Sequence, residues 1–142
     1  MPFFFLAALT LDIVSKHFAG IYLSSGRVVS LVPGVVRLFY VENRGAAFGI
    51  FQNTRYFLIA VSLSAVVFLL YLIIKKKHHD GWQYWSFYFL LTGAAGNMID
   101  RVRVGYVVDF IDFPHFPTFN FADIFINIGV LLLLTSLYKE KK

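Results

Sequence analysis

The stretch YFLIAVSLSAVVFLLYLII, at positions 56–74, decides the fold because its nineteen residues include no charged side chain. A helix of about 20 apolar residues is what crosses the hydrocarbon core of a lipid bilayer. Lys75, Lys76 and Lys77 follow the stretch directly, which is typical of charges that flank a span at a membrane surface. The sequence therefore predicts a membrane-spanning helix over 56–74.

Three further stretches are apolar enough for the same role, at positions 2–18, 82–99 and 121–138. Each is near the length that one span requires. The first is also compatible with a cleaved signal peptide, although it lacks a basic start and Asp12 interrupts its apolar run. We therefore expect an all-α membrane protein with four transmembrane helices, forming a single membrane-embedded domain over residues 1–142.

The composition supports this class and excludes others. Of the 142 residues, 58% are hydrophobic, 19% are aromatic and only 15% are charged, whereas a soluble domain is about half apolar and about a quarter charged. The absence of cysteine excludes a disulfide framework, a thiolate nucleophile and a cysteine metal site. Much of the net charge of +5 follows apolar runs directly, so no basic stripe for nucleic acid is expected. We expect no metal and no cofactor.

The distribution of basic residues predicts the orientation. Four spans place both termini and the loop after position 74 on one side, with six lysines: Lys75, Lys76, Lys77, Lys139, Lys141 and Lys142. The other side carries seven basic residues: Lys16, Arg27, Arg37, Arg44, Arg55, Arg101 and Arg103. The count alone does not decide, but the lysines lie in short segments beside the spans, where the positive-inside rule acts most strongly. We therefore predict cytoplasmic termini and an extracytoplasmic segment over 19–55.

This outer segment is too long to be a simple turn. Gly26, Pro33 and Gly34 break it, and VVRLFYVEN follows at 35–43. The β-branched and aromatic residues at 38–41 predict a short strand or hairpin on the membrane surface.

Two carboxylates stand out as candidate catalytic groups. Asp109 lies in GYVVDFIDF and Asp123 lies in FNFADIFI, at the two edges of the loop between the last two apolar stretches. If both stretches span, this loop folds back at the bilayer surface and brings the two acids together. Carboxylates are costly at that depth, and two that share a proton can activate a water molecule.

Each acid also has a purely structural interpretation. Asn120 is a good helix cap, and Asp123 three residues later can cap the same helix in return. Asp109 can be a solvated loop acid, although its neighbours on both sides are apolar. Asp112, which is followed by Pro114 and Pro117, is interpreted as an ordinary loop acid.

Other polar residues are spaced so that they can support such a site. The small residues GAAG at 93–96 let another helix approach closely. Asn97 and Arg101 lie four residues apart on one helix face, where the guanidinium can hold a carboxylate or a carbonyl. Asn43 offers amide groups, and Gly45 permits a tight turn.

Asp12 and Lys16 are also four residues apart, and they are expected to form an ion pair within the first helix.

Four motifs, in this order among the four stretches, resemble those of lipoprotein signal peptidase (signal peptidase II). They are LDIVSK at 11–16, NRGAAFG at 43–49, GAAGNMIDRVRVGYVVDFIDF at 93–113 and FNFADIFINIG at 119–129. The resemblance implies a multi-pass aspartic endopeptidase of the bacterial inner membrane. It removes the signal peptide of prolipoproteins just before a cysteine that carries diacylglycerol.

The resemblance also implies a fold and a site. It implies a small β-cradle and loop on the extracytoplasmic side, with the active site near the outer face of the membrane. Matched by motif, Asp109 and Asp123 are the catalytic pair. The positions that shape or support the site are Asp12, Lys16, Asn43, Gly45, Asn97, Arg101 and Asn120. The implied partners are prolipoprotein substrate, membrane lipids and cyclic peptide inhibitors of the globomycin type.

Two other classes of membrane protein are also compatible with the sequence. Membrane carboxylates also serve as proton or cation relays in small channels and transporters. A structural assembly protein would use its polar residues only to pack helices. A relay favours acids spread across the membrane depth, whereas Asp109 and Asp123 cluster on one side and 56–74 contains no ionisable side chain except tyrosine.

Overall fold

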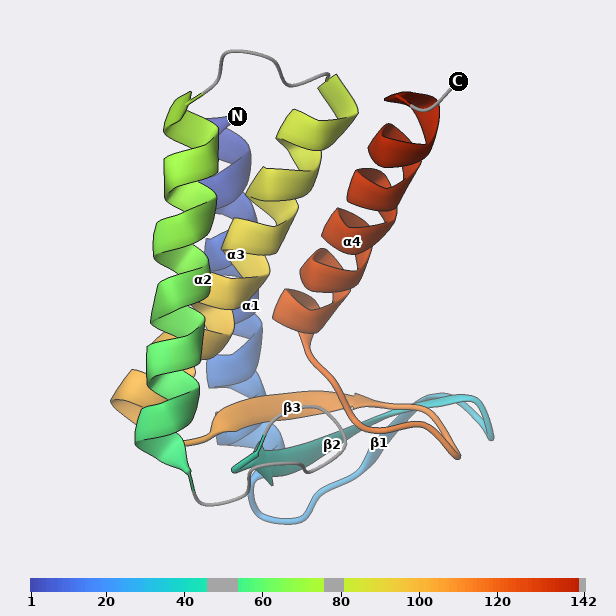
Figure 1. The fold of residues 1–142 in the computed structure, drawn as a ribbon. Coiled ribbons are helices and arrows are strands. Elements are labelled where there is room, and N and C mark those ends of the chain that lie inside the picture. The colour runs from blue at the N-terminus through green and yellow to red at the C-terminus, as the bar shows by residue number, and fades with distance from the viewer. Residues whose placement is uncertain (46–53, 76–80, 141–142) are drawn as a thin grey trace.

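The computed structural model describes residues 1–45, 54–75 and 81–140, so positions 46–53 of the predicted outer segment and Lys76, Lys77, Lys141 and Lys142 lie outside it. The elements, in chain order, are α1 (Pro2–Leu23), β1 (Val29–Val32), β2 (Val36–Asn43), α2 (Arg55–Lys75), α3 (Gly81–Arg103), β3 (Val107–Asp112) and α4 (Phe121–Glu140). Figure 1 shows the helices side by side, with the three strands laid across one end of the bundle. The N-terminus and the last turn of α4 lie at the opposite end.

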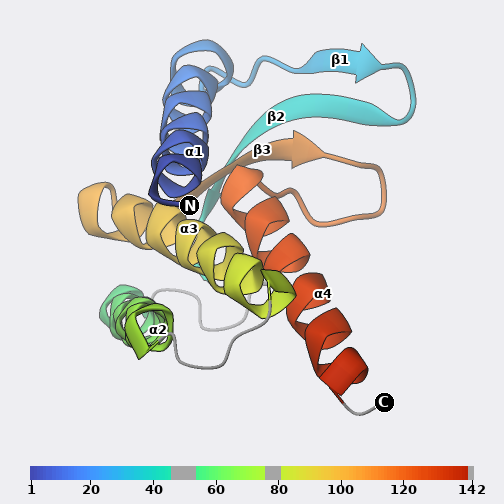
Figure 2. The same ribbon diagram turned by 90° about the horizontal axis from the view of Figure 1, so that it is seen from above.

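Three of the described helices, α1, α2 and α4, are long and apolar enough to cross a membrane. The four-span prediction is therefore met for three helices. The fourth, α3, is equally long but occupies the middle of the bundle and packs against the other three (Figure 2). Its buried positions include Ser86, Thr92 and Asn97, because much of its surface faces protein.

The predicted helix boundaries differ most at α1, which continues to Leu23 instead of ending at position 18. Ala19 and Leu23 are buried in a cluster with Val108 and Phe110 of β3. The last turn of α1 thus supports the sheet, and apolar burial keeps it helical beyond the predicted span.

The sheet is antiparallel in the order β1-β2-β3. Strand β2 contains the predicted run at 38–41, and β1 completes a hairpin with it. Strand β3 was not predicted from the residue pattern, because GYVVDFIDF was interpreted as loop. Its register pairs Asp109 with Val41 and Val107 with Asn43, so the sheet holds the first candidate acid.

The small residues of α3 pack against α4, as their pattern predicted. A Cβ atom added at Gly93 would lie 2.3 Å from the backbone oxygen of Ala122 and 2.5 Å from Cγ1 of Ile126. These two atoms leave no room for a methyl group, so Gly93 sets the closest approach of α4 at the turn that carries Asp123.

Replacing Gly93 by Ala should destabilise the protein by about 1–3 kcal/mol, because overpacking forces the two backbones apart. The melting temperature in detergent measures this effect. Gly81→Ala in the same helix is the matched control, since a Cβ there meets nothing within 4 Å. Equal melting temperatures for the two variants would contradict the packing argument.

Candidate active site

Asp109 is held in the middle of β3 with its side chain only 2% exposed. Asn43 of β2 donates an amide hydrogen bond to its Oδ2 at 2.9 Å, and Asn120 donates to its Oδ1 at 2.6 Å. Burial, together with the nearby carboxylate of Asp123, raises the pKa of Asp109 to about 7. The two amide donors act in the opposite direction, because they favour the charged form.

Asp123 lies in the first turn of α4 and forms the predicted capping box with Asn120. The backbone N–H of Asp123 donates to Asn120 Oδ1 at 3.0 Å, and the backbone N–H of Asn120 donates to Asp123 Oδ2 at 3.2 Å. The second oxygen, Oδ1, accepts a hydrogen bond from Asn97 Nδ2 at 2.8 Å. The interpretation of Asp123 as a helix-capping residue is thus correct, and Asp123 also accepts a hydrogen bond from Asn97 of α3.

Both acids line one cavity of about 480 Å³ beside the sheet. Its walls come from α2, α3, the end of β2, β3, the segment before α4 and the start of α4. Phe116 and Phe119, which sequence reasoning did not single out, form part of its apolar lining. The cavity therefore places two carboxylates, one with a strongly raised pKa, against a space that can hold a peptide segment.

Arg101 lines the same cavity and interacts electrostatically with Asp123 and Asp109. Its Nη2 donates to the backbone oxygen of Gly45 at 3.0 Å, and the Gly45 N–H donates to Asn43 Oδ1 at 3.1 Å. Arg101 and Asn43 therefore share a contact through Gly45, which ties the end of β2 to α3.

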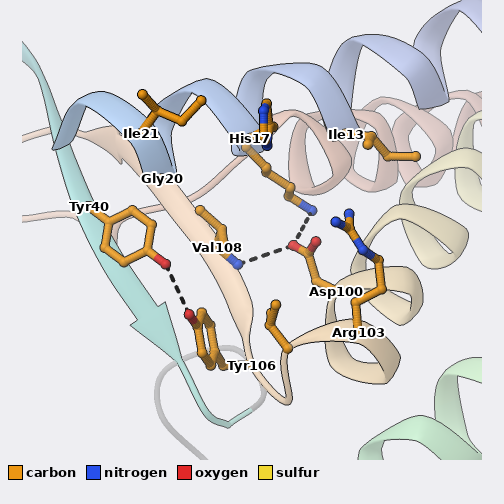
Figure 3. Close-up of a pocket in the computed structure, with 11 residues that line it drawn as sticks. Ile13, His17, Gly20, Ile21, Tyr40, Asp100, Arg103, Tyr106 and Val108 are labelled. Carbon is orange, nitrogen blue, oxygen red and sulfur yellow. Dashed lines mark hydrogen bonds and ion pairs between the residues drawn. The ribbon is translucent and has the colours of Figure 1, made fainter. Parts of the chain in front are cut away.

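Asp12 and Lys16 form the predicted ion pair at 2.8 Å. Sequence reasoning missed a third member, since Lys16 also pairs with Asp100 at 3.1 Å. Figure 3 shows Asp100 receiving a hydrogen bond from the backbone of Val108 in β3.

Asp12 also contacts the start of α4, because its Oδ1 accepts a hydrogen bond from the N–H of Ala122 at 2.8 Å. A Cβ at Gly96 would meet Asp12 Oδ2 at 2.4 Å, so this glycine makes room for the acid.

The nine site residues predicted from the sequence form one continuous set of contacts. In order of contact they are Asp12, Lys16, Asn97, Asp123, Asn120, Asp109, Asn43, Gly45 and Arg101. In the part of the chain that the structure describes, no three His, Cys, Asp or Glu side chains are grouped so that they could hold a metal ion.

The loop prediction for Asp112 is wrong. Asp112 is not an ordinary loop acid but a buried residue at the end of β3. Arg37 of β2 pairs with it, and Thr118 Oγ1 donates to its Oδ1 at 3.2 Å. Its partners lie on the neighbouring strand and in the connection to α4, so it stabilises the sheet.

Comparisons with known proteins agree with this arrangement. Residues 4–139 match the family model described as Signal peptidase (SPase) II. The lipoprotein signal peptidase of Streptococcus thermophilus (strain CNRZ 1066) is 39% identical over 143 residues, covering 99% of this chain and 94% of that protein. The lipoprotein signal peptidase of Streptococcus pyogenes serotype M1 is 36% identical over 133 residues, covering 92% and 88%.

Solved structures show the same fold. A bacterial membrane enzyme determined by the in meso method at 2.3 Å resolution superposes with a TM-score of 0.91 at 31% identity, covering 97% of this chain and 87% of that one. A second, determined at 1.9 Å resolution, has a TM-score of 0.84 at 31% identity, covering 94% and 88%. The match over nearly the whole chain, in sequence and in fold, shows that this chain belongs to the signal peptidase II family.

Proposed function

We propose that the chain removes signal peptides from prolipoproteins with Asp109 and Asp123 as its acid/base pair. The observation that carries this proposal is the placement of both carboxylates on one cavity, with the pKa of Asp109 raised to about 7. At neutral pH such a pair retains one proton, because two adjacent carboxylates cannot both ionise cheaply.

The burial of Asp109 favours it as the holder of this proton. Asp123 lies in the first turn of α4, where it accepts two N–H hydrogen bonds. Asp109 is buried in the sheet and its pKa is raised. Asp123 is therefore the base at rest and Asp109 the acid.

The reaction then follows as acid/base hydrolysis of a peptide bond. Asp123 takes a proton from a water molecule, the water oxygen attacks the scissile carbonyl, and Asp109 gives its proton to the carbonyl oxygen. As the tetrahedral intermediate collapses, Asp123 returns its proton to the leaving amine. Asp109 recovers a proton from one hydroxyl of the intermediate as the C–N bond breaks, and the two oxygens form the carboxyl group of the product. The pair ends in its starting state, and one water is consumed for each bond cleaved.

The orientation of the chain in the membrane determines on which side the site meets its substrate. We propose one membrane-embedded domain with α3 as a fourth span, cytoplasmic termini and the sheet on the extracytoplasmic face of the bacterial inner membrane. The lysines within 75–77 and 139–142 and the sheet at the end of the bundle away from the N-terminus (Figure 1) support this orientation.

The proposed substrate carries diacylglycerol on the cysteine that follows the cleaved bond. Its acyl chains can lie in lipid beside the helices, which holds the modified cysteine at the depth of the two acids. Cyclic peptide inhibitors of the globomycin type are proposed to occupy the same cavity, whose volume of about 480 Å³ suits a short peptide segment.

A cleavage assay tests the function directly. Purified protein is incubated with a diacylglyceryl-modified precursor peptide and with the same peptide unmodified. We expect a shortened, lipidated product from the first and little or none from the second. A proton or cation relay, or a structural assembly protein, would give no product with either peptide, and equal cleavage of both would reject the lipid requirement.

The pH dependence of kcat/KM should show an alkaline limb near pH 7. Since the pKa of Asp109 is raised to about 7, the pair keeps its proton below that pH and loses it above. The catalytic acid is then missing, and kcat/KM should fall by about tenfold per pH unit. Initial rates at low substrate concentration measure this profile, and a flat profile from about pH 6 to about pH 9 would contradict the assignment.

A further inference from the structure

Lys16 is one of the least accessible charged side chains of the described residues, with 3% of its surface exposed. Its ammonium group contacts three acceptors: Asp12 Oδ2 at 2.8 Å, Asp100 Oδ2 at 3.1 Å and Asn97 Oδ1 at 3.0 Å. An ammonium carries three N–H donors and no acceptor. The contact with Asn97 is a hydrogen bond, and the contacts with Asp12 and Asp100 are ion pairs. The hydrogen bond to Asn97 connects the ammonium to the candidate acids, because Asn97 in turn donates to Asp123.

The contact with Lys16 fixes the orientation of the Asn97 amide. Because Lys16 can only donate, the atom of Asn97 that faces it must be the oxygen. The NH₂ group then faces the other way, where it donates to Asp123 Oδ1 at 2.8 Å. If the amide turned over, its NH₂ would meet the ammonium and its oxygen would meet the carboxylate, and both contacts would be repulsive.

The same oxygen of Asn97 also accepts a hydrogen bond from Asn120. The Asn120 NH₂ group lies 3.2 Å from Asn97 Oδ1 and donates to Asp109 Oδ1 at 2.6 Å. The chain of contacts from Lys16 therefore divides at Asn97. One branch reaches Asp123 directly, and the other reaches Asp109 through Asn120.

We infer that Lys16 is a positioning residue, whose ammonium orients the amide of Asn97 and thereby sets the hydrogen bonds that both acids receive. This inference rests on the proposed catalytic role of Asp109 and Asp123. The ammonium contacts Asp12, Asp100 and Asn97, so its effect on the two candidate acids passes through the amides and through its charge.

The competing explanation is that Lys16 only holds helices together. It does link α1 to α3, and its partners Asp12 and Asp100 reach the N–H groups of Ala122 and Val108. A purely structural role predicts loss of folded protein with unchanged kinetics in what remains folded. A positioning role predicts changed kinetics in the folded fraction.

Electrostatics provides a readout that separates the two explanations. The charged groups that act on Asp109 are Asp123 on α4, which raises its pKa, and Lys16 on α1, which lowers it. Arg101 on α3 also interacts with Asp109. Removal of the Lys16 charge should therefore move the alkaline limb of kcat/KM to higher pH, which a helix-linking role would not do.

The central experiment compares Lys16→Met with the wild type. Among folded molecules, kcat for a lipidated precursor peptide should fall by about tenfold to a hundredfold, as for other misplaced catalytic groups. KM should change by less than about threefold, since Lys16 does not itself line the substrate cavity. Arg103→Gln is the control, because it removes an exposed cation that lines the same neighbouring cavity as Lys16 (Figure 3). It should leave kcat and the pH profile in place.

A double-mutant cycle with Asn97→Ala tests the route of the effect. If Lys16 acts through Asn97, Lys16→Met should add less than about a threefold further loss in the Asn97→Ala background. A folded Lys16→Met protein with wild-type kcat and an unmoved pH profile would overturn the inference, as would additive losses in the cycle.

A second variant keeps the test valid if Lys16→Met does not fold. The double variant Asp12→Asn/Lys16→Met keeps the net charge of this cluster at −1. In the wild type this charge is the sum of Asp12, Asp100 and Lys16, and in the variant Asp100 alone carries it. The amide oxygen introduced at position 12 can still accept from the N–H of Ala122, so the fold loses less. Reduced kcat in this variant supports the inference and wild-type kcat rejects it. If Asp109→Asn and Asp123→Asn proteins still cleave, it is instead the proposed function that fails.

Discussion

Replacing either Asp109 or Asp123 by Asn should abolish cleavage of a lipidated precursor, with kcat falling by about 10³-fold or more. An amide in place of Asp123 cannot take a proton from water. An amide in place of Asp109 cannot give one to the carbonyl oxygen. Each variant therefore lacks one of the two proton transfers that the reaction needs, and product formation under saturating substrate measures the loss.

Asp112→Asn is the matched control for this prediction. It makes the same change in the same strand, but its partners are Arg37 and Thr118 and it does not line the cavity of the two acids. The folded Asp112→Asn protein should keep its activity. Normal turnover by Asp109→Asn or Asp123→Asn would reject the acid/base pair.

Thermal stability separates lost chemistry from lost folding. Since the pKa of Asp109 is raised from its ordinary value to about 7, its ionisation costs folding free energy as the pH rises between these two values. The neutral form favours the fold below this window, and the cost is complete above it. Asp109→Asn removes this ionisable group, so its melting temperature should fall less with rising pH in this window than that of the wild type.

Local features of this molecule could be predicted from the sequence because each depends on a few neighbouring residues. The stretch at 56–74 became α2 almost without change at its ends. Asn120 and Asp123 cap the start of α4 because the reciprocal bonds need only their spacing of three. Asp12 and Lys16 pair because residues four apart share a helix face.

Features that depend on long-range packing could not be predicted in the same way. Asp100 joins Lys16 only because α1 and α3 cross at that level, and the sequence contains no sign of the crossing. Strand β3 exists because β2 offers it a hydrogen-bonding edge, and the register that buries Asp112 beside Arg37 follows from that pairing. The last turn of α1 is helical because the sheet covers it.

Asn120 should be nearly as important as the acids, because it is fully buried and contacts both of them. Asn120→Asp keeps the size of the side chain and the oxygen that caps α4, but it replaces the donor to Asp109 by a third carboxylate. We expect kcat to fall by about a hundredfold, as when a preorganised donor is lost from an active site. The added negative charge should also raise the pKa of Asp109 further, and the alkaline limb of kcat/KM should move to higher pH.

Asn120→Ser distinguishes capping from catalytic positioning. Serine is as good a helix cap as asparagine, but its hydroxyl is too short to reach Asp109 while it caps α4. If Asn120 matters only as a cap, the Ser and Asp variants should both keep wild-type kcat. If it positions the acids, both should lose kcat, and only Asn120→Asp should show the large alkaline shift, because only that variant adds a charge beside Asp109. Wild-type kcat and an unmoved pH profile in a folded Asn120→Asp protein would therefore remove Asn120 from the site.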